Sequence, residues 1–383
     1  MEAVSEGRLS LTDPGFVGQM YQCLDCRACE AVCPSGVSYG KLVEAARTQI
    51  ERAMPGSPLK HGIRWFVFRQ LFGNMRFFRL LSKLLHLYQR SGLQWLARKS
   101  GILRLLHLQE MESLLPAIPP SFLIPANQYY EPPATLPTNS TPVALFAGCI
   151  MSTAFAGTDR ATIRVLLAHG CSVIVPASQG CCGALTIHAG DMDEARIMAR
   201  QNIDAFERSG AGYIIANAAG CGAALKEYAH LFHEDPHYAE RAEHFSAQVR
   251  DITEFLAARP GTPPQQPLAL KVTYQEACHL VHAQRISQQP RKLLRSIPGI
   301  ELIEMQESAL CCGSAGTYNI TQPVMSRRLQ ERKIQQVQET GAEVVVTANP
   351  GCFLQLQDGL RRSGSSIRVM HIVDVLDRAY RQV

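Results

Sequence analysis

The 383-residue sequence has no run of about 18 uncharged apolar residues, so it contains no segment typical of a transmembrane helix. Its first 30 residues lack a basic segment followed by an apolar one, and we therefore expect no secretion. The glycine-rich motifs of dinucleotide-binding and phosphate-binding loops are missing, which predicts no nucleotide in this chain. No Ser/His/Asp or paired-carboxylate pattern stands out, so we assign no catalytic residue. These absences indicate a cytoplasmic protein whose activity depends on residues other than nucleotide-binding loops and catalytic triads.

Cysteine, in contrast, is abundant. The chain has 13 cysteines, and 46% of its residues are hydrophobic, which is enough to bury cores in two or three domains. Without a secretory signal, so many thiols indicate metal ligation or redox chemistry rather than a disulfide framework.

Charge is distributed unevenly along the chain. Between Arg52 and Gln109 there are 11 Lys or Arg residues and no Asp or Glu. Since the net charge of the whole chain is +5, the remainder carries −6. This asymmetry predicts a docking surface rather than a general affinity for nucleic acid.

Two proline-rich stretches divide the chain. Eight of the 22 prolines lie between Pro116 and Pro142, and four more lie between Pro260 and Pro267. Proline lacks a backbone donor and does not continue a helix, so both stretches are interpreted as extended linkers. The predicted parts are a helical ferredoxin-like domain with a basic aromatic extension over 1–115, a linker over 116–141, and two α/β repeats over 142–258 and 268–383.

The two repeats share a pattern of cysteines. Equivalent cysteines are separated by 129 to 131 residues: Cys149 and Cys278, Cys181 and Cys311, Cys182 and Cys312, Cys221 and Cys352. Four cysteines that keep register through single-residue insertions are strong evidence of an internal duplication.

Within each repeat, short apolar runs alternate with helical patterns. The first repeat has predicted strands at 143–146, 172–175 and 213–216 and predicted helices at 158–168 and 191–208. This alternation is typical of a parallel sheet, in which ligands gather beyond the carboxyl ends of the strands. Since Cys149, Cys221 and Cys352 follow such ends, the topology should bring the repeated cysteines together. The expected fold is α+β and multidomain, with a small helical ferredoxin-type domain followed by two duplicated α/β domains.

A run near the N-terminus has the form C-x2-C-x2-C-x3-C-P and contains Cys23, Cys26, Cys29, Cys33 and Pro34. This is the bacterial ferredoxin spacing for a cubane [4Fe–4S] cluster. A structural zinc site usually gathers its four thiolates from two separated pairs, which favours the cluster. In two-cluster ferredoxins the fourth cysteine ligates the other cluster, so either Cys33 closes this cluster or a second run lies elsewhere. Asp25 and Glu30 are interpreted as solvated charges.

Each repeat supplies a further set of four thiols. These are Cys149, Cys181, Cys182 and Cys221 in the first repeat, and Cys278, Cys311, Cys312 and Cys352 in the second. Adjacent cysteines do not easily face one tetrahedral ion, but they can bridge metals of a larger cluster. Gly183 and Gly313 would let the backbone approach a bulky inorganic core. We predict a further cluster here, with dithiol redox or buried structural cysteines as alternatives.

Three residues near these sets receive simpler interpretations. His279 and His282 follow Cys278 and are expected to be core histidines rather than ligands. Cys171 has no counterpart in the second repeat and is interpreted as a small apolar residue at the start of a strand.

The basic stretch is also aromatic. Helices broken near Gly73, Gly92 and Gly101 are predicted over 61–108, a segment that contains both tryptophans of the chain. A basic amphipathic helix with aromatic residues can lie on an anionic membrane surface. In an ordinary helical subdomain, the aromatic residues would form a core and the arginines would face an acidic partner. Both interpretations stay open, whereas nucleic acid is not favoured, because no recognition motif accompanies the charge.

Together these motifs resemble the glycolate oxidase iron–sulfur subunit family. The resemblance covers nearly the whole chain and is carried by residues 26–37 (CRACEAVCPSGV), 180–184 (GCCGA), 310–318 (LCCGSAGTY) and 347–352 (TANPGC). The wider group includes the Cys-Cys-Gly subunit of heterodisulfide reductase, the anaerobic glycerol-3-phosphate dehydrogenase small subunit and the lactate-utilisation iron–sulfur protein. Family members carry an earlier run of the ferredoxin form, so either Met1 is an internal start or the protein works with one cubane cluster.

The resemblance implies an electron-transfer subunit of a hetero-oligomeric oxidoreductase. It would take electrons from a flavin-containing subunit that oxidises glycolate or D-lactate and pass them toward membrane quinone, in the cytoplasm or at the inner face of the membrane. Related alternatives are subunits of glycerol-3-phosphate or lactate dehydrogenase complexes. A rival is a thiol–disulfide enzyme like heterodisulfide reductase, in which each Cys-Cys-Gly repeat extends to C-x-x-C where this chain has Ala224 and Gln355. Another rival is a zinc-stabilised interaction scaffold.

Overall fold

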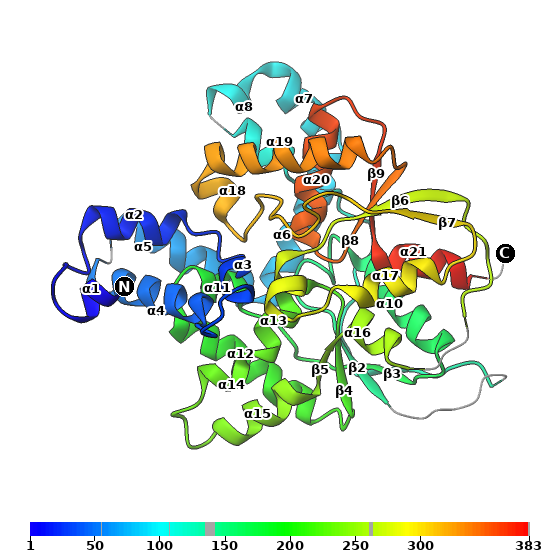
Figure 1. Ribbon diagram of the computed structural model, residues 1–383, viewed down its shortest axis with the longest axis horizontal. Coiled ribbons are helices and arrows are strands. Elements are labelled where there is room, and N and C mark those ends of the chain that lie inside the picture. The colour runs from blue at the N-terminus through cyan, green and yellow to red at the C-terminus, as the bar shows by residue number, and fades with distance from the viewer. Residues whose placement is uncertain (55, 107, 135–141, 260–262, 382–383) are drawn as a thin grey trace.

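A computed structural model describes residues 1–54, 56–106, 108–134, 142–259 and 263–381. The last seven residues of the predicted linker at 116–141 and residues 260–262 of the second proline-rich stretch lie outside the described residues. The chain has a mixed α/β architecture with two separate, largely parallel sheets and a helical N-terminal part (Figure 1).

The first sheet has the strand order β1-β3-β2-β4-β5. Its strands are β1 (Gln128–Tyr130), β2 (Val143–Phe146), β3 (Val173–Val175), β4 (Tyr213–Ala216) and β5 (Val249–Asp251). The strands β2 to β5 are parallel, and the three strands predicted from the sequence are present within one residue of the expected bounds. All four residues of β2 are buried, as a central strand covered on both faces requires.

Strand β1 departs from the sequence prediction in two ways. It lies within the segment interpreted as a linker, and it pairs antiparallel with β3, so that Tyr129 faces Ile174. An edge strand needs backbone hydrogen bonds on one side only. The three residues of β1 lie between Pro125 and Pro132 and include no proline, so they can form these bonds. The density of proline around this run concealed a strand from the sequence argument.

The second sheet repeats the parallel part of the first. Its strands are β6 (Leu270–Tyr274), β7 (Ile300–Ile303), β8 (Val344–Thr347) and β9 (Arg368–His371), in the order β7-β6-β8-β9. All neighbouring strands in this sheet are parallel. This order matches β3-β2-β4-β5 strand for strand, so the duplication predicted from the cysteine spacing is confirmed by the topology.

The two repeats pack against each other through helices that lie between the sheets (Figure 1). These are α10 (Ala156–Ala168) and α16 (Ile252–Ala257) of the first repeat, which pack against α21 (Ile372–Tyr380) and α17 (Gln288–Arg295) of the second. One hydrophobic core contains Val165 of the first repeat and Val375 of the second. Arg164 adds a bidentate pair to Asp377, with both N–O distances at 2.7 Å. The two repeats therefore share this core, while each also has a separate core beneath its outer helices.

Other helices cover the outer faces of the sheets. The first sheet is covered by α12 (Met192–Glu207) and α15 (Ala239–Gln248), and the second by α19 (Pro323–Glu339) and α20 (Pro350–Arg362). The remaining helices of the repeats are α11 (Ala184–His188), α13 (Ala219–Lys226), α14 (Tyr228–Leu231), α18 (Tyr318–Thr321) and the π-helix η2 (His279–Ala283).

The N-terminal part is helical throughout its regular structure. Its elements are α1 (Glu2–Ser5), α2 (Pro14–Gln22), α3 (Ala28–Ala31), α4 (Tyr39–Ala53), α5 (Pro58–Arg64), the π-helix η1 (Trp65–Phe72), α6 (Met75–Arg90), α7 (Leu93–Ser100), α8 (Ile102–Leu105) and α9 (Gln109–Ser113). Breaks at Gly73, Gly92 and Gly101 are confirmed, while a ferredoxin-type fold for the first helices stays a prediction. No helix among the described residues has both the length and the apolar character needed to cross a bilayer.

Candidate metal centre

The repeated cysteines lie beyond the carboxyl ends of three neighbouring strands. In the first repeat, Cys149 follows the central strand β2, Cys181 and Cys182 follow β3, and Cys221 lies in α13 after β4. The second repeat has the same arrangement after β6, β7 and β8. In a parallel sheet this is the edge at which bound groups are held. The topology thus gathers each predicted set at one place.

Within each repeat the sulfurs approach one another in pairs. The Sγ atoms of Cys149 and Cys181 are 3.7 Å apart, and those of Cys182 and Cys221 are 3.2 Å apart. The second repeat pairs the equivalent residues, Cys278 with Cys311 and Cys312 with Cys352. All 13 cysteines are free thiols.

The paired thiols differ in acidity because they share hydrogen bonds. The hydrogen bond from Cys149 and the one from Cys182 hold the pKa of Cys181 well below its usual range. The same contact with Cys181, together with burial, raises the pKa of Cys149. Contacts with Cys181 and Cys221 raise the pKa of Cys182 in the same way. Each buried thiol that ligates a metal must lose its proton, so metal binding at this edge releases protons.

The spacing of the sulfurs can be compared with that of a structural zinc site. A tetrahedral zinc ion with Zn–S bonds of about 2.3 Å holds its sulfurs about 3.8 Å from one another. In the part of the chain that the structure describes, Asp25, Glu44 and His188 are the one group of three metal-ligating side chains whose ligand atoms all lie within 4.8 Å of one another. No three thiols meet that limit there, so the sulfurs of the first repeat lie in pairs rather than in the closed tetrahedron of a zinc site.

Both Cys-Cys-Gly glycines have left-handed backbone, with φ of +76° at Gly183 and +88° at Gly313. This conformation favours glycine at both positions, and the close approach to an inorganic core expected from the sequence stays a prediction. Their surroundings differ, because a Cβ added at Gly313 would lie 2.5 Å from the Ser326 carbonyl oxygen. At Gly183 the nearest atom would be 3.7 Å away.

This difference predicts unequal costs for the same substitution. Gly183→Ala should lower the free energy of unfolding by about 1–2 kcal/mol, the cost of left-handed backbone in a residue with a Cβ. Gly313→Ala should lower the free energy of unfolding by the same amount and by about 1–3 kcal/mol more, because the added Cβ clashes with the Ser326 carbonyl oxygen. Urea unfolding of both variants measures the two losses, and equal losses would show that the Ser326 contact does not restrict Gly313.

The four cysteines of the N-terminal run lie in and around the tight loop between α2 and α3. Cys23 ends α2, Cys26 lies in the loop, Cys29 lies in α3, and Cys33 follows that helix. Asp25 and Arg27, on either side of Cys26, have positive φ angles of 52° and 60°. Such backbone is uncommon outside glycine and is typical of sites where the surrounding structure imposes the conformation.

Cys26 lies close to the second repeat. Burial, followed by the charges of Cys278 and Cys23, raises the pKa of the Cys26 thiol to about 11. The run is also tied to that repeat by three hydrogen bonds. Tyr318 Oη donates to the Gln22 carbonyl at 3.1 Å. His279 Nε2 contacts the Asp25 carbonyl at 3.1 Å. Arg285 Nη1 donates to the Ala31 carbonyl at 3.0 Å. The four-cysteine run therefore adjoins the cysteine set of the second repeat.

Asp25 is not the solvated charge expected from the sequence. It is 4% exposed, and its Oδ2 lies 2.9 Å from His188 Nδ1. Arg27 is equally buried and pairs with Glu44 at 3.4 Å and with Glu227 of the first repeat. Burial lowers the pKa of His188, but pairing with Asp25 and Glu44 outweighs it and raises the value to about 9. A buried charge network thus lies where the N-terminal part meets both repeats.

Other residues near the cysteines have structural partners. Glu30 is half-buried and accepts a hydrogen bond from the Gly40 amide at 3.0 Å. His279 stacks on His188 with ring centroids 5.1 Å apart, and His282 contacts the Ala309 carbonyl at 3.2 Å. Cys171 is buried in the core that the repeats share. These placements agree with the interpretation of both histidines and of Cys171 as core residues.

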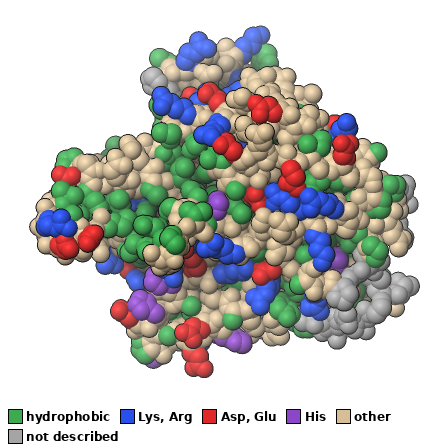
Figure 2. Space-filling view, viewed as in Figure 1, with side chains coloured by type: hydrophobic (Ala, Val, Ile, Leu, Met, Phe, Trp, Pro, Cys, Tyr) green, Lys and Arg blue, Asp and Glu red, His purple; other side chains and the backbone are tan. Residues whose placement is uncertain are grey.

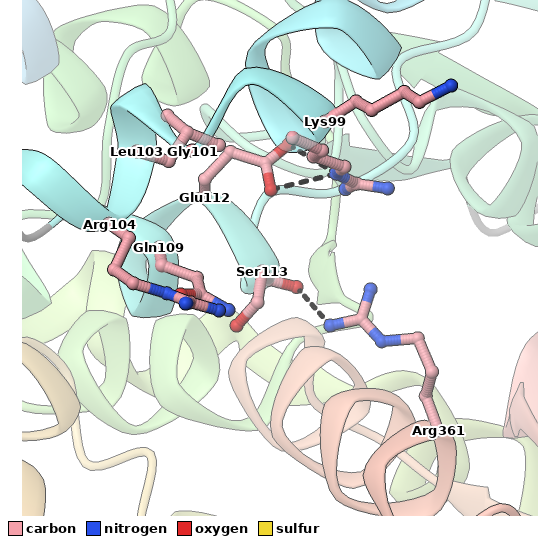
Figure 3. A pocket seen from close by; sticks show the side chains of 9 residues that line it. Lys99, Gly101, Leu103, Arg104, Gln109, Glu112, Ser113 and Arg361 are labelled. Atoms are coloured by element: carbon pink, nitrogen blue, oxygen red, sulfur yellow. Dashed lines mark hydrogen bonds and ion pairs between the residues drawn. The ribbon is translucent and has the colours of Figure 1, made fainter.

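A pocket of about 500 Å³ lies elsewhere, between α7, α8, α9 and α20 (Figure 3). Basic side chains dominate its lining, which includes Arg98, Lys99, Arg104 and Arg361 but no cysteine. Arg98 pairs with the buried Glu112 at 3.0 Å, and Arg361 donates to the Ser113 carbonyl at 3.0 Å. This pocket is separate from the thiol sites.

Comparison with protein families matches most of the chain to known models. The model described as "Cysteine-rich domain" matches twice, over residues 143–226 and 272–357. These matches contain all eight cysteines of the duplicated sets. The model described as "Glycolate oxidase iron-sulfur subunit, linker region" matches residues 60–115, which include α6 to α9.

Curated proteins show similarity along nearly the full length. A "Probable glycolate oxidase iron-sulfur subunit" from Bacillus subtilis (strain 168) is 42% identical over 384 residues, covering 98% of this chain and 85% of the relative. The "Glycolate oxidase iron-sulfur subunit" of Escherichia coli (strain K12) is 32% identical and covers 94% of this chain and 81% of the relative. "Lactate utilization protein A" of Oceanobacillus iheyensis is 34% identical and covers 61% of this chain and 96% of the relative.

Proposed function

The chain belongs to the glycolate oxidase iron–sulfur subunit family, and from this premise we propose that it is the electron-transfer subunit of a complex that oxidises glycolate or D-lactate. It would take electrons from a flavin-containing partner subunit and pass them toward membrane quinone. The observation that carries the proposal is the gathering of twelve free thiols into three sets, two at sheet edges and one in the adjoining N-terminal loop.

We propose that Cys23, Cys26, Cys29 and Cys33 hold a [4Fe–4S] cluster, and that the Cys-Cys-Gly sets provide ligands for a further cluster. A bound iron–sulfur cluster accepts and releases single electrons at a potential set by its surroundings. This chain supplies hydrogen bonds to the ligand sulfurs, as when the Asp25 amide donates to Cys23 Sγ at 3.4 Å. The Gly313 amide donates to Cys311 Sγ at 3.4 Å, and Asn349 Nδ2 donates to Cys352 Sγ at 3.5 Å. Such donors stabilise the thiolate form and tune the potential.

Of the two duplicated cysteine sets, the one in the second repeat is the better candidate for exchanging electrons with the N-terminal run. Asp25 and Gln22, on either side of Cys23, contact His279 and Tyr318 of that repeat. His279 is the neighbour of Cys278, and Tyr318 follows the Cys311-Cys312-Gly313 triplet by five residues. The chain therefore holds these two cysteine sets against each other, with few residues between them.

Substrate oxidation is assigned to the partner. Removing a hydride and a proton from a 2-hydroxy acid is the work of an organic cofactor such as a flavin, and the protein around it supplies orientation. The four thiols of the N-terminal run are exposed or half-buried, whereas seven of the other nine are buried. The role proposed for this chain is to position redox centres and to dock partners.

Cluster content and electron acceptance test the proposal together. The anaerobically purified chain should contain about eight irons and about eight acid-labile sulfides, and its EPR signals should appear on one-electron reduction and disappear on adding a quinone analogue. About four irons would restrict the assignment to the N-terminal run and remove the duplicated sets from it. Iron that is not reduced by the flavin subunit in the presence of glycolate or D-lactate would reject the electron-transfer role.

One observation favours a second candidate, dithiol–disulfide chemistry. The Sγ atoms of Cys182 and Cys221 are 3.2 Å apart, close enough to form a disulfide of about 2.05 Å after a small movement. A thiol–disulfide enzyme would reduce a small disulfide when given an electron donor, and Cys182→Ser would abolish that reaction. A protein that binds iron and sulfide and leaves the disulfide unreduced excludes this candidate.

A further inference from the structure

Helix α6 presents a row of exposed leucines. Leu80, Leu84 and Leu87 follow the spacing of one helical face, and each is between 52% and 61% exposed. Phe66 of η1 is also exposed and packs edge-on against Phe77 at 5.8 Å, which extends the row toward η1. Single exposed leucines are ordinary on protein surfaces, but a continuous row of large apolar side chains marks an interaction site.

The same character continues into the next two helices. Trp95 of α7 is 63% exposed between the exposed Leu93 and Leu96, and Leu105 of α8 is 78% exposed. These helices form a projecting end of the molecule, and Figure 2 shows Lys and Arg side chains gathered there. We call the exposed apolar residues of η1 and α6 to α8 the leucine face.

Cations without acidic partners border the leucine face. Arg76, Lys83 and Arg90 are exposed on α6, and within the described ranges no carboxylate forms an ion pair with any of them. Lys99 lies over the Trp95 ring at 4.7 Å. In contrast, Arg52, Lys60, Arg64 and Arg98 of the same basic stretch do pair with carboxylates. Three unpaired charges of α6 therefore lie beside the leucines.

A basic pocket opens beside this face. Figure 3 shows Arg104 extending from α8 into the pocket, where Arg98 and Arg361 are already bound to protein groups. Among the residues that can be described, Arg104 has neither an ion-pair partner nor a side-chain hydrogen bond, and Lys99 also lines the pocket. Arg104 is therefore a cation available to a phosphate group in this pocket of about 500 Å³.

We infer that the leucine face docks on a membrane surface that contains anionic phospholipid, with lipid phosphate held at Arg104. Leucine and tryptophan side chains would enter the boundary between headgroups and acyl chains. Arginine and lysine stems would lie along the apolar side chains while their charged ends reach lipid phosphates. An acidic protein partner would leave the chain in solution with anionic vesicles, so the vesicle measurement distinguishes these two occupants.

This inference deepens the proposed function, since it places the electron-transfer subunit where membrane quinone is available. The inference rests on the proposed function only for the statement that the subunit meets quinone at the membrane. Binding to lipid vesicles is measured without any redox reaction, so failure of one proposal can be distinguished from failure of the other.

Vesicle co-sedimentation of the iron-loaded chain tests the inference. The protein should pellet with vesicles of phosphatidylcholine and phosphatidylglycerol, remain in solution with phosphatidylcholine alone, and lose binding as ionic strength rises. The triple change Arg76→Glu, Lys83→Glu and Arg90→Glu should weaken binding about 100-fold or more, because each basic residue near an anionic surface contributes roughly 1 kcal/mol. Leu80→Ser with Leu84→Ser and Leu87→Ser should weaken it at least about tenfold.

A control with the same change in net charge uses exposed arginines on other elements, namely Arg208→Glu, Arg328→Glu and Arg368→Glu. This control should keep binding within about threefold of the unchanged chain. Equal losses in the two charge-reversed variants, equal binding to both kinds of vesicle, or no binding to anionic vesicles would overturn the inference. Iron content serves as the check that each variant has folded.

Discussion

Replacing Cys26 by Ser is expected to remove the EPR signal of the N-terminal centre and about four irons per chain. Cys26 is the second cysteine of the run, and it lies between two residues with left-handed backbone that the surrounding network holds in place. A serine hydroxyl is a hard, weakly acidic ligand, and it does not replace a thiolate on iron. Electron flow from the flavin subunit should be lost with the signal.

A suitable control is Cys171→Ala, which removes a buried thiol that belongs to none of the three cysteine sets. It should keep the full iron content and lose no more than about 1–2 kcal/mol of stability. If Cys26→Ser kept its iron and its spectrum, the assignment of the N-terminal run would be wrong. Loss of iron in both variants would indicate general unfolding rather than a lost ligand.

Replacing Arg27 by Met should lower the free energy of unfolding by about 3–5 kcal/mol, because removal of one partner from a buried ion network leaves the others unpaired. The guanidinium pairs with Glu44 and Glu227, and its side chain is only 3% exposed. Glu227 lies in the first repeat, so the same change should loosen the contact between the N-terminal part and that repeat. Denaturant unfolding measures the loss, and limited proteolysis between α3 and α4 reports the loosening.

Arg241→Met is the matched control. Arg241 also pairs with two carboxylates, those of Asp204 and Glu207, but its side chain is 35% exposed. Exposed pairs contribute less than about 1 kcal/mol, so this variant should be nearly as stable as the unchanged chain. If the two arginine variants lost the same stability, the network around Arg27 would not be a structural joint.

The sequence predicted much of the repeats because their signals are local. The strands β2 and β4 are short apolar runs with the predicted bounds, and the cysteine offsets reveal the duplication. Parallel topology then places Cys149, Cys182 and Cys221 at one edge without any knowledge of side-chain contacts. These predictions follow from periodicity and spacing alone.

The features that sequence reasoning missed depend on contacts between distant residues. Asp25 resembles a surface charge until His188, which lies 163 positions away in the chain, is placed beside it. The π-helix η2 begins directly after Cys278 and carries no recognisable signal in its sequence. Strand β1 was not predicted because prolines flank it. The structure tolerates these prolines because β1 pairs along one side, with β3. The shared core of the two repeats is likewise invisible in either repeat alone.

Quantifying iron and acid-labile sulfide in the anaerobically reconstituted chain tests the central claim most directly. We predict a brown protein with iron and sulfide in equal amounts, about eight of each per chain. A colourless protein that holds zinc through its thiols and contains no sulfide would contradict the assignment of these cysteines to redox centres.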